Sequence, residues 1–355
     1  MKRKILLSLA LTLCLAGCST SAAHTVPLNS QEYAASLPYA ASDMRGKHVG
    51  LVSNEDMRFE LEQGLMDLSK QYFSPTSLTF RNHAFLDYDE LDATDGSRGL
   101  LGTLRDNNPN GLNPGSGEQF DTGNGISVGP ILVGDLYEID YYSQNDLSGI
   151  AIGLLVADKA EVDGQDVEIT PEAMYSYFQV TSTKLVAYLR ERFNEVSRNT
   201  PILVAAYQMN TDPSDSSNGG YIYEGYFTGN TGKFTEISQE YLLTPSTRFI
   251  SEFPELASEF AQFKSQVSQI LPDDAYVTGK LRVENGAPVM LQIKVETFGK
   301  TAGEALAAIQ SVNQDLSSFT STDMAYKVTI FNGTEVCAMI ERETGSAKTN
   351  VITIY

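Results

Sequence analysis

Cys18 is the residue of this chain with the most specific chemistry. Residues 15–18 read LAGC, so small residues stand directly before the cysteine. A basic start at residues 2–4 and a short apolar run over 5–15 precede it, which is the pattern of a lipoprotein signal peptide. In such a precursor, prolipoprotein diacylglyceryl transferase modifies the thiol of Cys18, and signal peptidase II cuts between Gly17 and Cys18. An ordinary secretory signal with an accidental cysteine is the alternative.

The same pattern predicts where the protein is located. The apolar run is shorter than the roughly 20 residues that a membrane-spanning helix needs, and no later segment is long enough either. We expect residues 1–17 to be removed and the lipid on Cys18 to anchor the chain at the extracellular face of the cell membrane. Residues 18–44 are rich in serine and alanine and are expected to form a flexible tether.

The charge balance argues against one class of partners. Lys and Arg number 25 while Asp and Glu number 45, so the net charge is −20. Such a chain repels phosphate polymers, and we expect no nucleic-acid partner. Cys14 leaves with the signal and Cys18 takes the lipid, so Cys337 stays without a disulfide partner. Because Cys337 lies in the apolar run 336–340, we expect a buried strand thiol rather than a nucleophile.

The search for catalytic groups finds little. The three histidines are His24, His48 and His83, and a histidine-based triad would have to use one of the last two. For His83 we favour a surface or structural role. A nucleophile elbow, a zinc-protease motif and a phosphate-binding loop are all missing from the sequence, and the aspartates of 87–92 lack the spacing of a calcium loop. We therefore expect no enzyme activity, no metal and no cofactor.

Hydrophobic periodicity predicts an α+β fold with two β-β-α-β-β units. An N-terminal helix over 55–72 precedes the first unit, which covers 136–227, and the second unit covers 276–341. We expect antiparallel or mixed sheets, each backed by its helix, and a parallel pair within either unit would overturn the repeat. The domains would be 45–240 for the first unit with its N-terminal helix, and 241–355 for a junction helix and the second unit.

Capping signals indicate where the helices begin. Thr170 is the expected N-cap of the first unit's helix, with Pro171 at its first position, and Thr301 opens the second with a capping box. The helix at 254–270 is expected to pack across the junction. The expected buried faces are Met174, Phe178, Leu185, Leu189 and Phe193 in the first unit's helix, and Leu306, Ile309, Leu316 and Phe319 in the second.

One aromatic strand is a candidate binding surface. Residues 221–227 read YIYEGYF, and Tyr221, Tyr223 and Tyr226 could stack on a sugar or a peptide. Strand alternation would place Tyr221 and Tyr223 on one face of the sheet. Half-buried packing is the simpler interpretation, because aromatic residues favour strands in any case.

Several short motifs resemble the CamS family. They are GLMDLSK at 64–70 with YFSP at 72–75, the apolar strand 149–156, the segment 201–208 with its AYQ, and YLLTPS at 241–246. The resemblance implies a lipoprotein associated with sex-pheromone biosynthesis in low-GC Gram-positive bacteria. In that family the cleaved signal fragment can be trimmed to a short apolar peptide that other cells sense. The corresponding segment here is 11–17, where Cys14 departs from the family's Phe- and Ile-containing peptide.

The resemblance implies no chemical activity for the folded body. The main alternative is a ligand-binding lipoprotein, either a transporter receptor or a module that binds peptide or cell wall. Transporter receptors use two lobes with parallel strands. The Asn285-Gly286 hairpin signal in the second unit argues against that architecture.

Overall fold

The computed structural model describes residues 23–27, 31–52, 54–96, 98–101, 108–212, 214–271 and 275–354. The predictions on the signal peptide, on Gly17 and on Cys18 therefore lie outside the described residues. In the described part of the chain, no helix combines the length and the hydropathy needed to cross a membrane.

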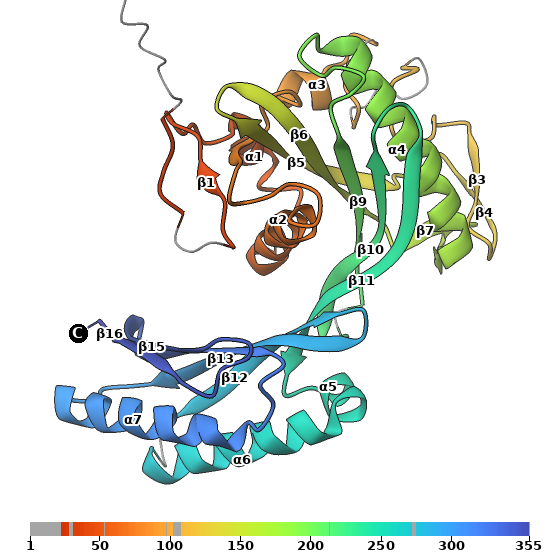
Figure 1. The fold of residues 1–355 in the computed structure, drawn as a ribbon. Coiled ribbons are helices and arrows are strands. Elements are labelled where there is room, and N and C mark those ends of the chain that lie inside the picture. Colours follow the sequence, from red (N-terminus) through yellow and green to blue (C-terminus); the bar gives the residue numbers. More distant parts are fainter. Residues whose placement is uncertain are drawn as a thin grey trace, which may run out of the picture.

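A single mixed sheet organises the fold (Figure 1). It has 12 strands in the order β1-β2-β5-β6-β9-β10-β11-β12-β13-β14-β15-β16. The first elements are β1 (Ala34–Ala35), α1 (Asp43–His48), α2 (Glu55–Ser69), β2 (Thr79–Asn82), α3 (Tyr88–Asp92), β3 (Gln119–Asp121) and β4 (Ile126–Val128). Next come β5 (Val133–Ser143), β6 (Asp146–Val156), β7 (Lys159–Val162), β8 (Gln165–Glu168), α4 (Pro171–Arg192), β9 (Ile202–Met209), β10 (Ser217–Phe227) and β11 (Gly232–Thr244). The rest comprises α5 (Thr247–Glu252), α6 (Pro254–Ile270), β12 (Tyr276–Glu284), β13 (Ala287–Thr297), α7 (Ala302–Asp315), a short 3-10 helix (Leu316–Ser318), β14 (Ala325–Asn332), β15 (Glu335–Arg342) and β16 (Asn350–Thr353).

The two predicted sheets are one continuous sheet, because β11 joins them. This strand pairs antiparallel with β10 on one side and with β12 on the other. In each half, the middle pair is parallel, β6 with β9 and β13 with β14. The expectation of a mixed sheet is therefore confirmed, whereas the expectation that neither unit contains a parallel pair is wrong. A single helix that crosses one face of a sheet returns the next strand in the same direction, so the neighbours that α4 and α7 connect are parallel.

The capping signals place both crossover helices correctly. The Thr170 hydroxyl accepts a hydrogen bond from the N–H of Ala173, and Thr301 forms the full capping box with Glu304. The buried face of α4 contains Met174, Phe178, Leu185 and Leu189 as predicted, with Phe193 only partly buried at the end. The prediction for Leu306 is wrong, since this side chain is 41% exposed. The buried residues of α7 are Ala305, Ala308, Ile309 and Val312.

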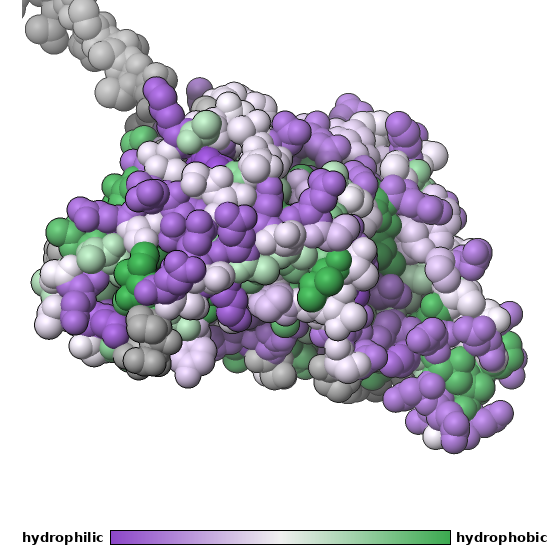
Figure 2. Space-filling view, turned by 90° about the horizontal axis from the view of Figure 1, so that it is seen from below, coloured by the Kyte–Doolittle hydropathy of each residue, from purple (hydrophilic) through white to green (hydrophobic). Residues whose placement is uncertain are grey.

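Three hydrophobic clusters fill the space between helices and sheet. Helix α2 covers one face of β5, β6, β9 and β10, and α4 covers the opposite face. Helices α6 and α7 lie together on one face of the C-terminal strands (Figure 1). Helix α6 was expected to pack across the junction, which is wrong, because Phe260 and Phe263 belong to the same cluster as α7. The outer surface of this helical layer is mostly hydrophilic, with apolar side chains in small separate groups (Figure 2).

The described part of the expected tether, from residue 31 onward, belongs to the folded body. Strand β1 pairs parallel with β2 at the edge of the sheet. Tyr33 is buried, its hydroxyl donates to the carbonyl of Phe73 at 2.6 Å, and its ring lies 4.7 Å from that of Tyr141. Met44 is also buried. A flexible tether over all of 18–44 is therefore wrong, because this segment carries apolar side chains that the core accepts.

Cys337 gives a direct test of packing in the C-terminal half. It lies on β15, is 7% exposed and belongs to the cluster beneath α6 and α7. We expect its thiol to react slowly with a maleimide in the native protein and quickly in denaturant, measured by mass spectrometry of the peptide that contains it. As the matched control, Cys337→Ala combined with Met339→Cys should label quickly in the native protein, because Met339 is 46% exposed on the same strand. Fast native labelling at Cys337 itself would contradict the buried position.

Candidate functional site

The three candidate tyrosines do not form one surface. Tyr221 is 1% exposed, and its hydroxyl donates to the carbonyl of Leu61 at 2.7 Å on the α2 side of the sheet. Tyr223 packs on the α4 side, where its hydroxyl donates to the carbonyl of Pro171 at 2.9 Å. The prediction that both share a face is wrong, because the pairing register shifts between them and the extra residue reverses the alternation. Tyr226 stacks on Tyr72 with ring centroids 4.2 Å apart.

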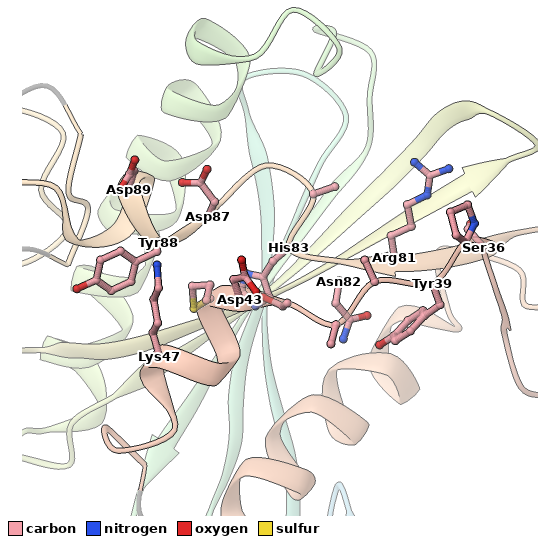
Figure 3. Close-up of a pocket in the computed structure, with 16 residues that line it drawn as sticks. Ser36, Tyr39, Asp43, Lys47, Arg81, Asn82, His83, Asp87, Tyr88 and Asp89 are labelled. Atoms are coloured by element: carbon pink, nitrogen blue, oxygen red, sulfur yellow. The ribbon is translucent and has the colours of Figure 1, made fainter.

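A groove of about 710 Å³ opens instead at the N-terminal edge of the sheet. Figure 3 shows its lining, which comes from the segment before α1, from α1 itself, from the end of β2 and from the start of α3. Its volume lies in the range typical of small-molecule sites. The residues that line it are Ser36, Pro38, Tyr39, Ala40, Ala41, Ser42, Asp43, Met44, Lys47, Arg81, Asn82, His83, Ala84, Asp87, Tyr88 and Asp89.

The groove carries charges of both signs. The Lys47 ammonium lies 4.1 Å from the centre of the Tyr88 ring, and the Arg81 guanidinium lies 4.4 Å from that of Tyr142. Within the described residues, neither cation has a carboxylate within ion-pair distance. Asp87 caps α3 by accepting a hydrogen bond from the N–H of Glu90. The Arg81 guanidinium nevertheless acts to lower the pKa of Asp140, its cross-strand neighbour on β5, and three aspartates line the groove beside the two cations.

A buried ionic network forms the floor beneath α1. Asp135, on β5, is fully buried and accepts hydrogen bonds from Arg45 at 2.8 and 2.9 Å and from His48 at 2.9 Å. The other ring nitrogen of His48 contacts Asp92 at the end of α3. Burial acts to raise the pKa of Asp135, but the hydrogen bonds from His48 and Arg45 outweigh it and hold that pKa below its ordinary value. Burial also opposes charge on His48, yet Asp135 and Asp92 raise its pKa.

His83 sits at the end of β2 with a positive φ of 48°. Its Nε2 lies 3.2 Å from the backbone N–H of Glu138, a group that can only donate, so this nitrogen accepts. The proton is therefore on Nδ1, which donates to the carbonyl of Leu86 at 3.1 Å. Burial, with a smaller contribution from Arg45, lowers the pKa of His83 to about 3. The imidazole is thus neutral and holds the turn that follows β2.

Two buried carboxyl groups hold the same turn. Glu138 accepts hydrogen bonds from the N–H groups of Phe85 and Leu86 at 2.9 and 2.7 Å, and Asp140 accepts one from Ala84 at 2.9 Å. Burial and the neighbouring Glu138 raise the pKa of Asp140 well above its ordinary value. Asp140 Oδ1 is buried without a hydrogen-bond partner among the described residues, which is the environment in which a carboxyl group keeps its proton to a higher pH.

The two histidines near the groove are held by structural hydrogen bonds. The ring nitrogens of His48 hydrogen-bond to carboxylates, and those of His83 hydrogen-bond to backbone groups. In the described part of the chain, no serine, threonine or cysteine hydrogen-bonds to either ring. Over the same residues, no group of three or more potential metal ligands comes together. The sequence did contain a signal that our motif search missed. Asp135, Glu138 and Asp140 interrupt an otherwise apolar and aromatic strand, and buried acids of this kind need partners.

The comparisons with known proteins agree with the motif resemblance. The family described as CamS sex pheromone cAM373 precursor matches residues 39–348. Among solved structures, a sex pheromone precursor from Lactobacillus salivarius subsp. salivarius UCC118 has a TM-score of 0.79 at 21% identity, covering 94% of this chain and 99% of that chain. The C-terminal domain of the sex pheromone staph-cAM373 precursor from Staphylococcus aureus has a TM-score of 0.69 at 18% identity, with coverages of 86% and 98%. No curated protein sequence matches. Because the family match extends over most of the chain, the protein belongs to the CamS family.

Proposed function

We propose that this chain is a lipoprotein precursor, anchored at the extracellular face of the cell membrane through Cys18, whose cleaved signal fragment supplies a short peptide signal. The observation that carries the proposal is the LAGC sequence at 15–18 in a chain of a family described as pheromone precursors. The segment 11–17 is the part of the fragment from which the peptide would come. In this proposal the folded body is non-catalytic and stays at the membrane when the peptide leaves.

The thiol of Cys18 is the group on which this maturation depends. Cys18→Ala removes the acceptor of diacylglycerol, and signal peptidase II acts on the lipidated form, so we expect the loss of both lipidation and cleavage. Metabolic labelling with a palmitate analogue, followed by gel electrophoresis, measures both. Cys14→Ala is the matched control, since Cys14 lies within the signal and should be dispensable. Equal labelling of the wild type and Cys18→Ala would contradict the proposal.

We also infer that the two halves of the sheet are copies of one β-β-α-β-β unit that has a parallel pair at its centre, in place of the unit without parallel neighbours that the sequence predicted. The order of pairing supports this, because β5-β6-β9-β10 and β12-β13-β14-β15 both read antiparallel, parallel, antiparallel. Each crossover helix also begins at a threonine N-cap. Superposing the two sets of strands tests the inference, and α4 should then fall on α7.

The groove favours a second role, for the folded body. In this proposal a lipid anchor holds the protein at the outer surface, and the groove between α1, β2 and α3 has the size of a ligand site and a lining with charges of both signs. We propose that the folded body binds a ligand there, independently of the peptide released from the signal.

A further inference from the structure

We infer that the two halves of the fold rotate against each other about β11, and that ion pairs between α2 and β12 hold them in the arrangement seen here. The N-terminal half comprises the elements before β11, and the C-terminal half comprises those after it. Three features of the described residues support this movement, namely a narrow strip of sheet at the junction, separate hydrophobic cores, and a contact that charged side chains make.

The strip of sheet that joins the halves is narrow. Among the described strands, β11 alone pairs with both halves, with β10 over 232–242 and with β12 over 239–244. Only the stretch 239–242 therefore has a neighbouring strand on each side, and the chain passes between the halves once, along this strand (Figure 1). A strip of two or three strands twists more readily than a broad sheet. Strand β11 is therefore the hinge.

Each half has its own hydrophobic core. The two clusters on the faces of the N-terminal strands contain residues from 33–237, and the cluster beneath α6 and α7 contains residues from 242–340. Within the described parts of the chain, no hydrophobic cluster includes side chains from both halves. Two bodies that share no large apolar contact are expected to move relative to each other.

Charged side chains make the contact between α2 and β12. The Lys280 ammonium lies 2.9 Å from the carboxylate of Asp56 and 2.8 Å from that of Glu60, and the Arg282 guanidinium lies 2.5 Å from the carboxylate of Asp67. The side chains of Glu60 and Asp67 are only 5% and 14% exposed, so solvent and salt screen these pairs less than surface pairs. The pairs therefore favour one arrangement of the halves over others.

Other contacts at the junction constrain the rotation less. The N–H of Asn285 donates to the carbonyl of Ser238 at 2.7 Å, which continues the pairing of β11 with its neighbour. Arg248 on α5 pairs with Asp215 at 3.4 Å, and partly exposed pairs of this kind contribute little. The pairs on α2 are therefore the contacts whose loss should release the halves.

A groove between the halves would change with this rotation. It has a volume of about 610 Å³ and lies between α2 and the C-terminal strands. Gln63 and Gln71 line it from the N-terminal half, and Lys327 and Thr344 line it from the C-terminal half. Because its two walls belong to different bodies, the ion pairs between α2 and β12 set how wide this groove is.

Pulsed electron paramagnetic resonance tests the inference on the full-length chain in detergent micelles. Cys14, Cys18 and Cys337 are replaced by alanine, so that no native thiol takes a label. Nitroxide labels are then attached at Gln71→Cys and Thr344→Cys, two exposed positions on opposite walls of the groove. The measurement gives the distribution of distances between the labels, and far-UV circular dichroism checks that each variant is folded.

The informative variant is Lys280→Gln combined with Arg282→Gln, which removes both cations that face α2. We expect the mean distance between the labels to lengthen by more than about 2 Å and the distribution to broaden, because α2 no longer holds β12. The matched control is Lys294→Gln combined with Lys327→Gln. It removes the same charge, but these lysines pair with glutamates of the C-terminal half, so the distances should stay as in the wild type.

A second variant keeps the test decisive if the double variant does not fold. Asp67→Asn retains the size of the side chain and weakens only the pair with Arg282, so it should shift the distances in the same direction by a smaller amount. Wild-type distances in the folded double variant, or in Asp67→Asn where only that variant folds, would overturn the inference. An equal shift in the lysine control would also overturn it, because the α2 pairs would then have no special part in holding the halves.

Discussion

Asp135→Ala is expected to lower the free energy of unfolding by about 3–5 kcal/mol. The fully buried carboxylate holds Arg45 through two hydrogen bonds and His48 through a third. Its removal leaves the Arg45 guanidinium and the His48 imidazole beneath α1 without their main partner, and that cost exceeds any gain from losing a buried anion. Urea denaturation at neutral pH measures the effect.

The matched control for this change is Asp166→Ala, since Asp166 is an exposed aspartate on β8. We expect that control to stay within about 0.5 kcal/mol of the wild type. Asp135→Asn keeps the size of the side chain and should fall between the two. A loss below about 1 kcal/mol for Asp135→Ala would mean that the network contributes no more than an ordinary hydrogen bond.

The stability of the protein is expected to depend on pH through His83. In the unfolded chain this imidazole gains a proton below its ordinary pKa of about 6.5, whereas the fold holds the pKa at about 3. Above pH 6.5 both states are neutral and the full stability is present. As the pH falls from 6.5 toward 3, the unfolded state binds the extra proton, and the free energy of unfolding falls by up to about 1.4 kcal/mol per pH unit.

The difference in the free energy of unfolding between the wild type and His83→Gln, measured against pH, isolates the contribution of His83. His48, with its raised pKa, contributes with the opposite sign, since its stabilisation is lost as the pH rises through the folded-state value. Because His48 and the buried carboxyl groups titrate in both proteins, their contributions to the pH dependence cancel in the comparison. We expect urea midpoints of the wild type to fall more steeply below pH 6.5 than those of His83→Gln. The exposed His24, changed to Gln, should follow the wild type, and parallel curves for His83→Gln would refute the assignment.

Local sequence signals predicted the elements well where one face of an element is buried. The α6 prediction matches the observed Pro254–Ile270, and the N-caps at Thr170 and Thr301 are confirmed. These signals depend on neighbours within a turn or two of helix, so the sequence alone contains them. The outer bounds predicted for the two groups of strands, 136–227 and 276–341, lie close to the observed start of β5, end of β10, start of β12 and end of β15.

Features that depend on distant partners were missed. Strand β11 alternates between exposed and partly buried residues over most of its length, so it showed no apolar run and the continuity of the sheet went unnoticed. The register shift at Tyr221–Tyr223 depends on how three strands pair. The candidate site was missed for the same reason. Asp135, His48 and Asp92 are far apart in sequence, and only the packing of α1 and α3 against β5 brings them together.

The N-terminal residue of the mature protein tests the central claim most directly. Between Cys18 and Arg45 the sequence contains no lysine or arginine, so trypsin should release a single peptide over 18–45. Mass spectrometry of that peptide from membrane-extracted protein is the measurement. The account predicts that it begins at Cys18 and carries a diacylglyceryl group on the thiol. An unmodified cysteine, or an N-terminus at any other residue, would contradict it.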